Sequence, residues 1–442
     1  MGRTASTLGE RLAKQLSCFC RCANAPGRHA CGLLIAASLA VLFAAGCTKP
    51  VPELIKSAEN YRAEGDNSAA VIELLNAIKQ SPASQRAHLL LGSVYADMGD
   101  AVQAETELRT SIALGAAPAQ FLPPLGTALI EQEKYAELLE QVRGLDDAKP
   151  EPELAGEMAL QRGRAYLGLA KPADAKRQFG LALQVKPLAA KLGLAQTAMA
   201  ENSLAEAEKF TDEAVATAPV SPDAWVAKGE LLRFKSKTDE AKAAFDQALK
   251  LQPRFVPALL SDASLLLASG KIEAARAQLE KAERIAPASV KLHFTQAVLA
   301  LRERKFELCR NELDLVFAIV PRHMPATLLS GALFLATGHP EQAQSAALIF
   351  LRRYPMHVYA RKILAGALLR KEQPKSAAFV LEPLLPLVKD DAQLLALAAQ
   401  AQSQIGKIDS ARSLLEAAVA VAPSDAELRV GLGLSRLAAG EN

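Results

Sequence analysis

The stretch that decides the fold is residues 222–255, PDAWVAKGELLRFKSKTDEAKAAFDQALKLQPRF. Gly229 and Ala241 are small residues at the places where two antiparallel helices would cross closely, and Pro253 begins a new turn. Larger apolar residues fill the gaps around that crossing: Trp225, Leu232 and Phe245. The segment therefore predicts a helical hairpin with one apolar face.

Prolines repeat this unit along the chain. They recur every 34 residues, with a double interval before the last: Pro219, Pro253, Pro287, Pro321, Pro355 and Pro423. Because a single hairpin cannot bury its apolar face alone, neighbouring hairpins must stack to complete the core. Only one Trp and 5% aromatic residues accompany abundant Ala and Leu, which also favours an all-α chain.

Seven positions of this unit resemble the tetratricopeptide repeat: Trp225, Gly229, Leu232, Ala241, Phe245, Ala248 and Pro253. The resemblance implies a right-handed superhelical solenoid of about eleven helix-turn-helix repeats and one last helix over residues 51–442. We expect an irregular joint at residues 115–155, where Pro123 and Pro124 interrupt the pattern. The unit between Pro187 and Pro219 reads as two residues short.

Residues 1–46 have the layout of a secretory signal peptide. A basic region precedes an apolar stretch of about 15 residues, which is shorter than the roughly 20 that span a bilayer. Ala44-Ala45-Gly46-Cys47 resembles a lipobox. The resemblance implies cleavage before Cys47, acylation of its thiol, a short linker at residues 47–50 and, with Thr48 next, a place at the periplasmic face of the outer membrane. An ordinary cleaved signal peptide or an uncleaved anchor is the alternative.

Residues 52–79 and 89–115 resemble the opening of PrsT-like proteins, the tetratricopeptide-repeat lipoproteins of exosortase (PEP-CTERM) systems. The resemblance implies a lipid-anchored, periplasm-facing scaffold for protein–protein interactions. Its setting would be exopolysaccharide biosynthesis and export, or the sorting of C-terminally tagged proteins. The alternative is a structural accessory lipoprotein of an outer-membrane secretion assembly that contacts a β-barrel.

The charged and reactive residues do not indicate an enzyme or a nucleic-acid binder. Beyond residue 46 the chain carries 46 basic and 47 acidic residues, and nucleic acid requires a clearly basic face. Only Cys309 lies in the repeats, at a small position typical of an inert thiol. His323, His339 and His357 are spaced unlike a helix-borne metal pair. We therefore expect no catalysis, no cofactor and no metal.

In such solenoids the first helix of each repeat lines a concave groove with its second, fifth, ninth and twelfth positions. Transferred by that resemblance, the candidate partner groove consists of Leu260, Leu267, Lys291, Phe294, Val298, Leu301, Leu328, Leu335, Tyr359 and Lys362. Residues 302–375 hold twelve Lys or Arg and six Asp or Glu. We expect a protein partner, either an extended peptide with an acidic flank or an export-system component, with an anionic polysaccharide as another ligand. The alternative is that these charges are only solvated helix faces.

Overall fold

The computed structural model describes residues 49–146 and 149–438, and in these ranges it contains helices and no strand. Eleven helical hairpins follow one another there and a last helix ends the series, which confirms the predicted right-handed superhelical solenoid. The predicted signal peptide and Cys47 lie outside the described residues. No helix of the described ranges is both long and apolar enough to cross a bilayer.

The first helices of the hairpins are α3 (Val51–Glu64), α5 (Gln85–Asp97), α7 (Pro118–Glu131), α9 (Pro152–Gly168), α11 (Pro187–Ala200), α13 (Pro222–Phe234), α15 (Val256–Ala268), α17 (Val290–Arg302), α19 (Met324–Ala336), α21 (Val358–Arg370) and α23 (Ala392–Ile405). The second helices are α4 (Asn67–Gln80), α6 (Ala101–Ala113), α8 (Tyr135–Arg143), α10 (Pro172–Ala182), α12 (Leu204–Thr217), α14 (Thr238–Leu251), α16 (Ile272–Glu283), α18 (Phe306–Ile319), α20 (Pro340–Arg353), α22 (Pro374–Leu381) and α24 (Ile408–Val421). A 3-10 turn, η3 (Glu382–Leu384), follows α22, and α25 (Ala426–Ala438) is the last helix.

The hairpin of α13 and α14 shows why the repeat folds as it does. Pro222 begins α13 with its fixed backbone angle, and the Ser221 hydroxyl accepts a hydrogen bond from the Ala224 amide at 3.4 Å. The Phe245 ring of α14 lies so close to Gly229 that a β-carbon at Gly229 would be 2.4 Å from the ring. The two helices approach this closely because Gly229 has no side chain.

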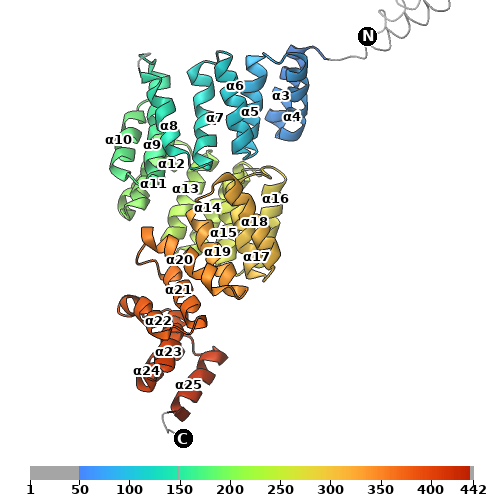
Figure 1. Cartoon of the computed structure of the whole chain (residues 1–442). Helices are drawn as coiled ribbons and strands as arrows, with labels where there is room; N and C mark the ends of the chain where they lie inside the picture. The colour runs from blue at the N-terminus through green and yellow to red at the C-terminus, as the bar shows by residue number, and fades with distance from the viewer. Residues whose placement is uncertain (1–48, 147–148, 439–442) are drawn as a thin grey trace, which may run out of the picture.

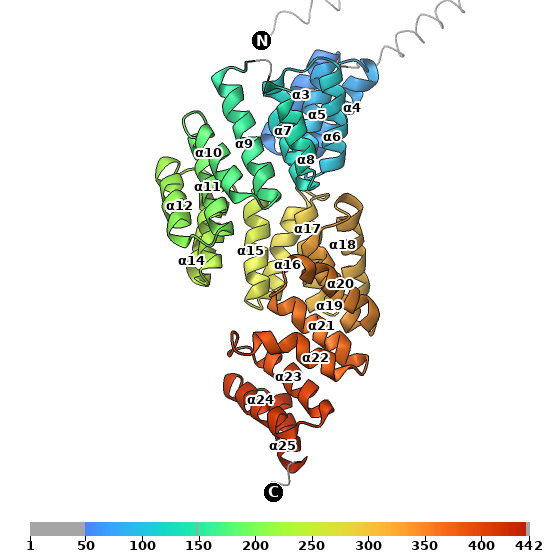
Figure 2. The same ribbon diagram turned by 60° about the vertical axis from the view of Figure 1, so that its left-hand side comes forward.

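The stacked hairpins coil into a superhelix whose successive turns touch. The group of helices α3–α8 lies next to the group α15–α18 (Figures 1 and 2). Arg254, in the turn before α15, donates a hydrogen bond to the Gly65 carbonyl at 2.9 Å. Gly99 lies so close to Ser289 that an added β-carbon would be 2.8 Å from the Ser289 Cβ. We name this contact the seam: Gly65 and Gly99 on one turn, Arg254 and Ser289 on the other.

The unit that begins at Pro187 is not short, so that prediction is wrong. Helix α11 begins at Pro187 and α13 begins at Pro222, 35 residues later. Both prolines occupy the first turn of a helix, whereas Pro219 lies in the connection before its helix. The two kinds of proline are different positions of the repeat, so the distance from Pro187 to Pro219 does not measure a unit.

Residues 115–155 hold an irregular hairpin that nevertheless stays helical. Helix α7 continues through Pro123 and Pro124, although proline donates no backbone hydrogen bond. Its partner α8 has only nine residues. In the connection to α9, Lys149 adopts a positive φ of 45°.

Candidate functional site

Cavities follow one another along the inner face of the superhelix, which we name the lumen. An upper pair, of 520 and 410 Å³, lies along α11 and α13 and shares three lining residues, Leu192, Gln196 and Asp223. A lower pair, of 490 and 290 Å³, lies along α19 and α21 and shares Tyr359. Most lining residues come from first helices, so the repeat itself builds the site.

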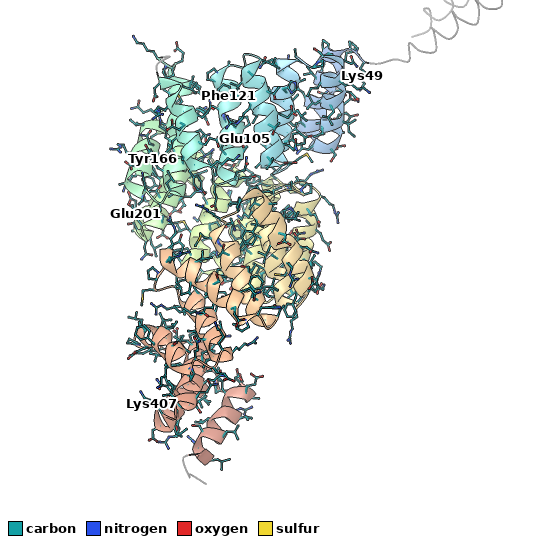
Figure 3. The ribbon with its side chains drawn as sticks, in the orientation of Figure 1. Lys49, Glu105, Phe121, Tyr166, Glu201 and Lys407 are labelled. Carbon is teal, nitrogen blue, oxygen red and sulfur yellow. The ribbon has the colours of Figure 1, made fainter. Side chains whose placement is uncertain are left out.

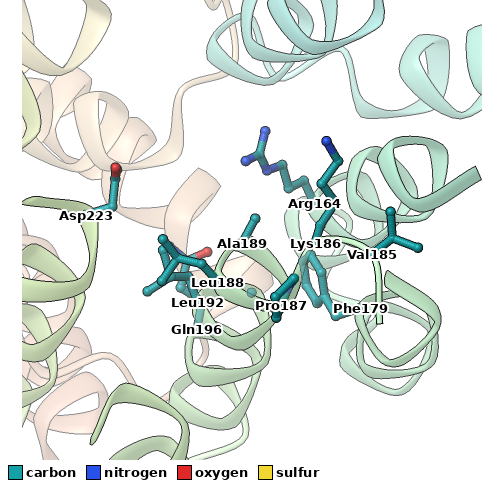
Figure 4. A pocket seen from close by; sticks show the side chains of 11 residues that line it. Arg164, Phe179, Val185, Lys186, Pro187, Leu188, Ala189, Leu192, Gln196 and Asp223 are labelled. Atoms are coloured by element: carbon teal, nitrogen blue, oxygen red, sulfur yellow. The ribbon is translucent and has the colours of Figure 1, made fainter. Parts of the chain in front are cut away.

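Charged side chains of both signs line the upper pair. In Figure 4, Arg164 and Asp223 lie on opposite sides of the first cavity. In the second cavity the Lys291 ammonium donates a hydrogen bond to the Ser261 hydroxyl at 3.3 Å. Glu230 lines the same cavity and pairs with Arg233 at 2.7 Å. With Lys186, the linings of the upper pair hold three cations and two carboxylates, so a ligand meets charges of both signs there.

The charges of the upper pair influence one another. Burial lowers the pKa of Lys291, and the Glu230 carboxylate opposes that shift. Burial would raise the pKa of Glu230, but the Ser261 hydrogen bond and the Lys291 charge hold this pKa below its ordinary value. Lys291 keeps solvent-exposed surface. Its environment is therefore the enclosed lumen and not the packed core.

The lower pair combines an apolar floor with a cationic rim. The larger cavity is lined by Phe294, Val298, Leu301, Arg302, Pro325, Leu328, Leu329, Phe350, His357 and Tyr359. The smaller is lined by Ala332, Leu335, Ala336, Tyr359, Lys362, Ile363, Gly366, Arg370, Gln393 and Leu397. Every residue with a permanent charge in the two linings is cationic, namely Arg302, Lys362 and Arg370.

Eight of the ten predicted groove residues line these cavities. Lys291 lines the second upper cavity. The larger lower cavity brings together Phe294, Val298, Leu301, Leu328 and Tyr359. Leu335 and Lys362 line the smaller lower cavity beside Tyr359.

The groove positions predicted for Leu260 and Leu267 are wrong. Each side chain is only 2% exposed, and both pack in one core cluster with Leu292 of α17. Helix α15 is apolar on nearly every face and packs against the first helices on both sides, α13 and α17. Leu260 and Leu267, at the fifth and twelfth positions of this unit, are therefore covered by neighbouring helices and do not line the lumen.

Sequence reasoning missed two carboxylates of the upper pair. Asp223 and Glu230 occupy the second and ninth positions of the unit at 222–255, the same positions that identified Lys291 and Val298 in a later unit. If the second and ninth positions had also been selected in the unit at 222–255, both carboxylates would have been predicted as lumen residues. Burial raises the pKa of Asp223, and the charge of Arg164 opposes this shift.

The residues considered for catalysis or metal binding are core or helix-capping residues. Cys309 is fully buried, and burial raises the pKa of its thiol to about 11. The Nδ1 atoms of His323 and His357 accept helix-capping hydrogen bonds from the Ala326 and Ala360 amides at 3.1 and 3.2 Å. Within residues 49–146 and 149–438, no three His, Cys, Asp or Glu side chains are grouped to hold a metal ion.

A sequence model of the family described as tetratricopeptide repeat matches residues 55–120, 160–222, 226–307, 328–383 and 397–442. No curated protein sequence matches the chain. Similar solved structures include the APC/C hetero-tetramer Cut9-Hcn1, with 13% identity over 89% of this chain and 98% of that chain and a TM-score of 0.46. A tetratricopeptide repeat protein from Parabacteroides merdae has 13% identity over 64% and 98% of the two chains and a TM-score of 0.40. Yeast Tom70 has 17% identity over 90% of each chain and a TM-score of 0.37. Because the family model covers well over half of the sequence, this chain belongs to the tetratricopeptide repeat family.

Proposed function

We propose that this protein is a lipid-anchored scaffold that binds an extended segment of a partner protein along its lumen. The observation that carries the proposal is the series of cavities that successive first helices build on the inner face. Tetratricopeptide arrays are suited to protein–protein interaction. A stack of repeats offers a long concave surface, and an extended segment makes contact with several units at once.

The residues that follow Cys47 support an anchor held close to the array. Lys49 forms an ion pair with Glu73 at 2.7 Å, and its carbonyl accepts a hydrogen bond from Gln80 at 3.1 Å. Only Thr48 separates Lys49 from Cys47 in the sequence. Acyl chains on Cys47 would therefore hold the first hairpin at the membrane surface. Lys49 and Lys407 lie near opposite ends of the superhelix (Figure 3), so the last units would extend away from that surface.

We assign the scaffold to the periplasmic face of the outer membrane, in an exopolysaccharide or protein export system. This assignment is supported by the lipobox-like sequence that ends at Cys47 and by the resemblance of residues 52–115 to PrsT-like lipoproteins. The competing assignment is an accessory lipoprotein that contacts an outer-membrane β-barrel. The identity of a partner cross-linked from the lumen decides between the two.

Site-specific photo-cross-linking tests the lumen as the binding surface. One variant carries p-benzoylphenylalanine in place of Tyr359 in the lower pair, and the matched control carries it in place of Leu348 on α20, outside the cavities. The two positions are 43% and 45% exposed, so the probe is equally accessible at both. We expect a discrete cross-linked product in living cells from position 359 and none from position 348. The same product from both positions, or none from position 359, would contradict the proposal.

A further inference from the structure

The floor of the lower pair is built to exclude polar groups. Phe294, Val298 and Leu301 of α17 line the larger cavity together with Leu328 and Leu329 of α19. Its volume of 490 Å³ lies within the range of about 300–1,000 Å³ that is typical of ligand sites. A ligand that fills this floor must present an apolar group, because a hydroxyl or charge placed there would lose its hydrogen bonds to water.

One of the three cations on the rim, Arg302, forms no ion pair in the part of the chain that the structure describes and lines the cavity with the apolar floor. Lys362 pairs with Asp391 at 2.9 Å, and Arg370 donates a hydrogen bond to the Leu335 carbonyl. Arg302 forms no ion pair with any residue of the described ranges. Arg302 and Tyr359 line the same cavity, and the charge of Arg302 opposes the rise that burial causes in the pKa of Tyr359. A guanidinium in this position would bind a carboxylate through two parallel hydrogen bonds.

From this juxtaposition we infer that the lower pair binds a protein segment in which a bulky apolar side chain directly neighbours an Asp or Glu residue. The apolar side chain fills the cavity floor, and the carboxylate pairs with Arg302 above it. This inference rests on the proposed function and specifies the segment that the lumen selects. An anionic polysaccharide would satisfy the cationic rim, but its hydroxyl groups have no hydrogen-bonding partner on the apolar floor.

The upper pair does not have this selectivity. Two carboxylates, Asp223 and Glu230, line it together with three cations, Arg164, Lys186 and Lys291. An acidic segment placed there would meet like charges, which disfavours it. A lining with cations and no carboxylate is therefore found in the lower pair and not in the upper pair, and this difference would fix the register of a segment that runs along the lumen.

Binding of three fluorescein-labelled peptides to the full chain in detergent tests the inference. Each peptide is a Gly/Ser decapeptide with a central Asp-Asp-Phe, Lys-Lys-Phe or Asp-Asp-Gly sequence. We expect the Asp-Asp-Phe peptide to bind at least about tenfold more tightly than either of the others, measured by fluorescence anisotropy. Equal binding of all three, or binding of none, overturns the inference. Displacement of the Asp-Asp-Phe peptide by alginate at equal carboxylate concentration also overturns it, in favour of a polysaccharide ligand.

Exposed residues allow matched variants that leave the core intact. Arg302→Glu should reverse the preference from Asp-Asp-Phe to Lys-Lys-Phe, whereas Arg352→Glu, at an exposed arginine outside the cavities, should not change it. Tyr359→Ala should weaken Asp-Asp-Phe binding without reversing the preference. An equal effect of Arg302→Glu and Arg352→Glu overturns the inference. If position 359 still cross-links a partner in cells while no charge preference exists, the proposed function stands and only this inference fails.

Discussion

Replacing Gly229 with Ala tests whether the close crossing of α13 and α14 limits residue size in the repeat. The added β-carbon would lie 2.4 Å from Cε1 and 2.6 Å from Cδ1 of Phe245. That ring is fully buried and packs with Leu232 and Leu265, so a shift of the ring would disturb these neighbours. We expect overpacking to cost about 1–3 kcal/mol. The higher helix propensity of Ala offsets about 1 kcal/mol of this cost, so the variant should be less stable than the wild type.

Gly180→Ala is the matched control. No atom lies within 4 Å of the β-carbon that it adds on α10. It gains helix propensity without a clash, so the free energy of unfolding should rise by up to about 1 kcal/mol. Adding Phe245→Leu to Gly229→Ala should recover part of the lost stability, because the smaller side chain makes room for the methyl group.

Urea denaturation followed by circular dichroism measures these differences. Amide hydrogen exchange in α13 should accompany it, because a long repeat array need not unfold in one step. The two alanine variants should differ by about 1–3 kcal/mol, with Gly229→Ala the less stable. If Gly229→Ala proved as stable as Gly180→Ala, the close crossing would not constrain this position and the reasoning would be refuted.

Four further predictions concern other parts of the chain. Arg254→Ala removes the hydrogen bond across the seam, so small-angle scattering should show a longer particle, with little change in the unfolding midpoint; an unchanged particle length would contradict this. Because Cys309 is buried and its pKa is raised to about 11, iodoacetamide near neutral pH should label it only in the denatured chain, as mass spectrometry will show. Burial lowers the pKa of His323, so the unfolded chain takes up the proton first and stability falls as the pH drops below about 6.5. The thermal midpoint of His323→Asn, whose cap does not titrate, should fall less over the same range. Cys47→Ala should abolish fatty-acid labelling of the chain, and label that persists in the variant would exclude the anchor.

The repeat and much of the lumen could be predicted from the sequence because the pattern is local. Proline spacing and the small residue Gly229 determine the hairpin within 34 residues, and position in the hairpin places Phe294 and Tyr359 in the lumen. The rule failed at Leu260, because the exposure of a groove position depends on how closely neighbouring first helices approach it. That distance is set by side chains of other units and is absent from the pattern of one repeat.

The seam could not be predicted because its partners are far apart in the sequence and share no motif. Arg254 and Gly65 are 189 residues apart, and their contact depends on the accumulated rotation of all the units between them. A small error in the rotation per unit, repeated over several units, moves Arg254 away from Gly65. The signal peptide and the acylation of Cys47 remain predictions from sequence.

The seam also has a mechanical consequence. Neighbouring turns of the superhelix are joined by weak contacts across the seam, and these contacts hold the coil in its short form. Tension between the two ends of the superhelix would first break the hydrogen bond between Arg254 and Gly65. The coil would then lengthen by small rotations between units while every hairpin stayed folded. A molecule tethered at one end and loaded at the other would therefore be stiff under small forces and compliant beyond a threshold.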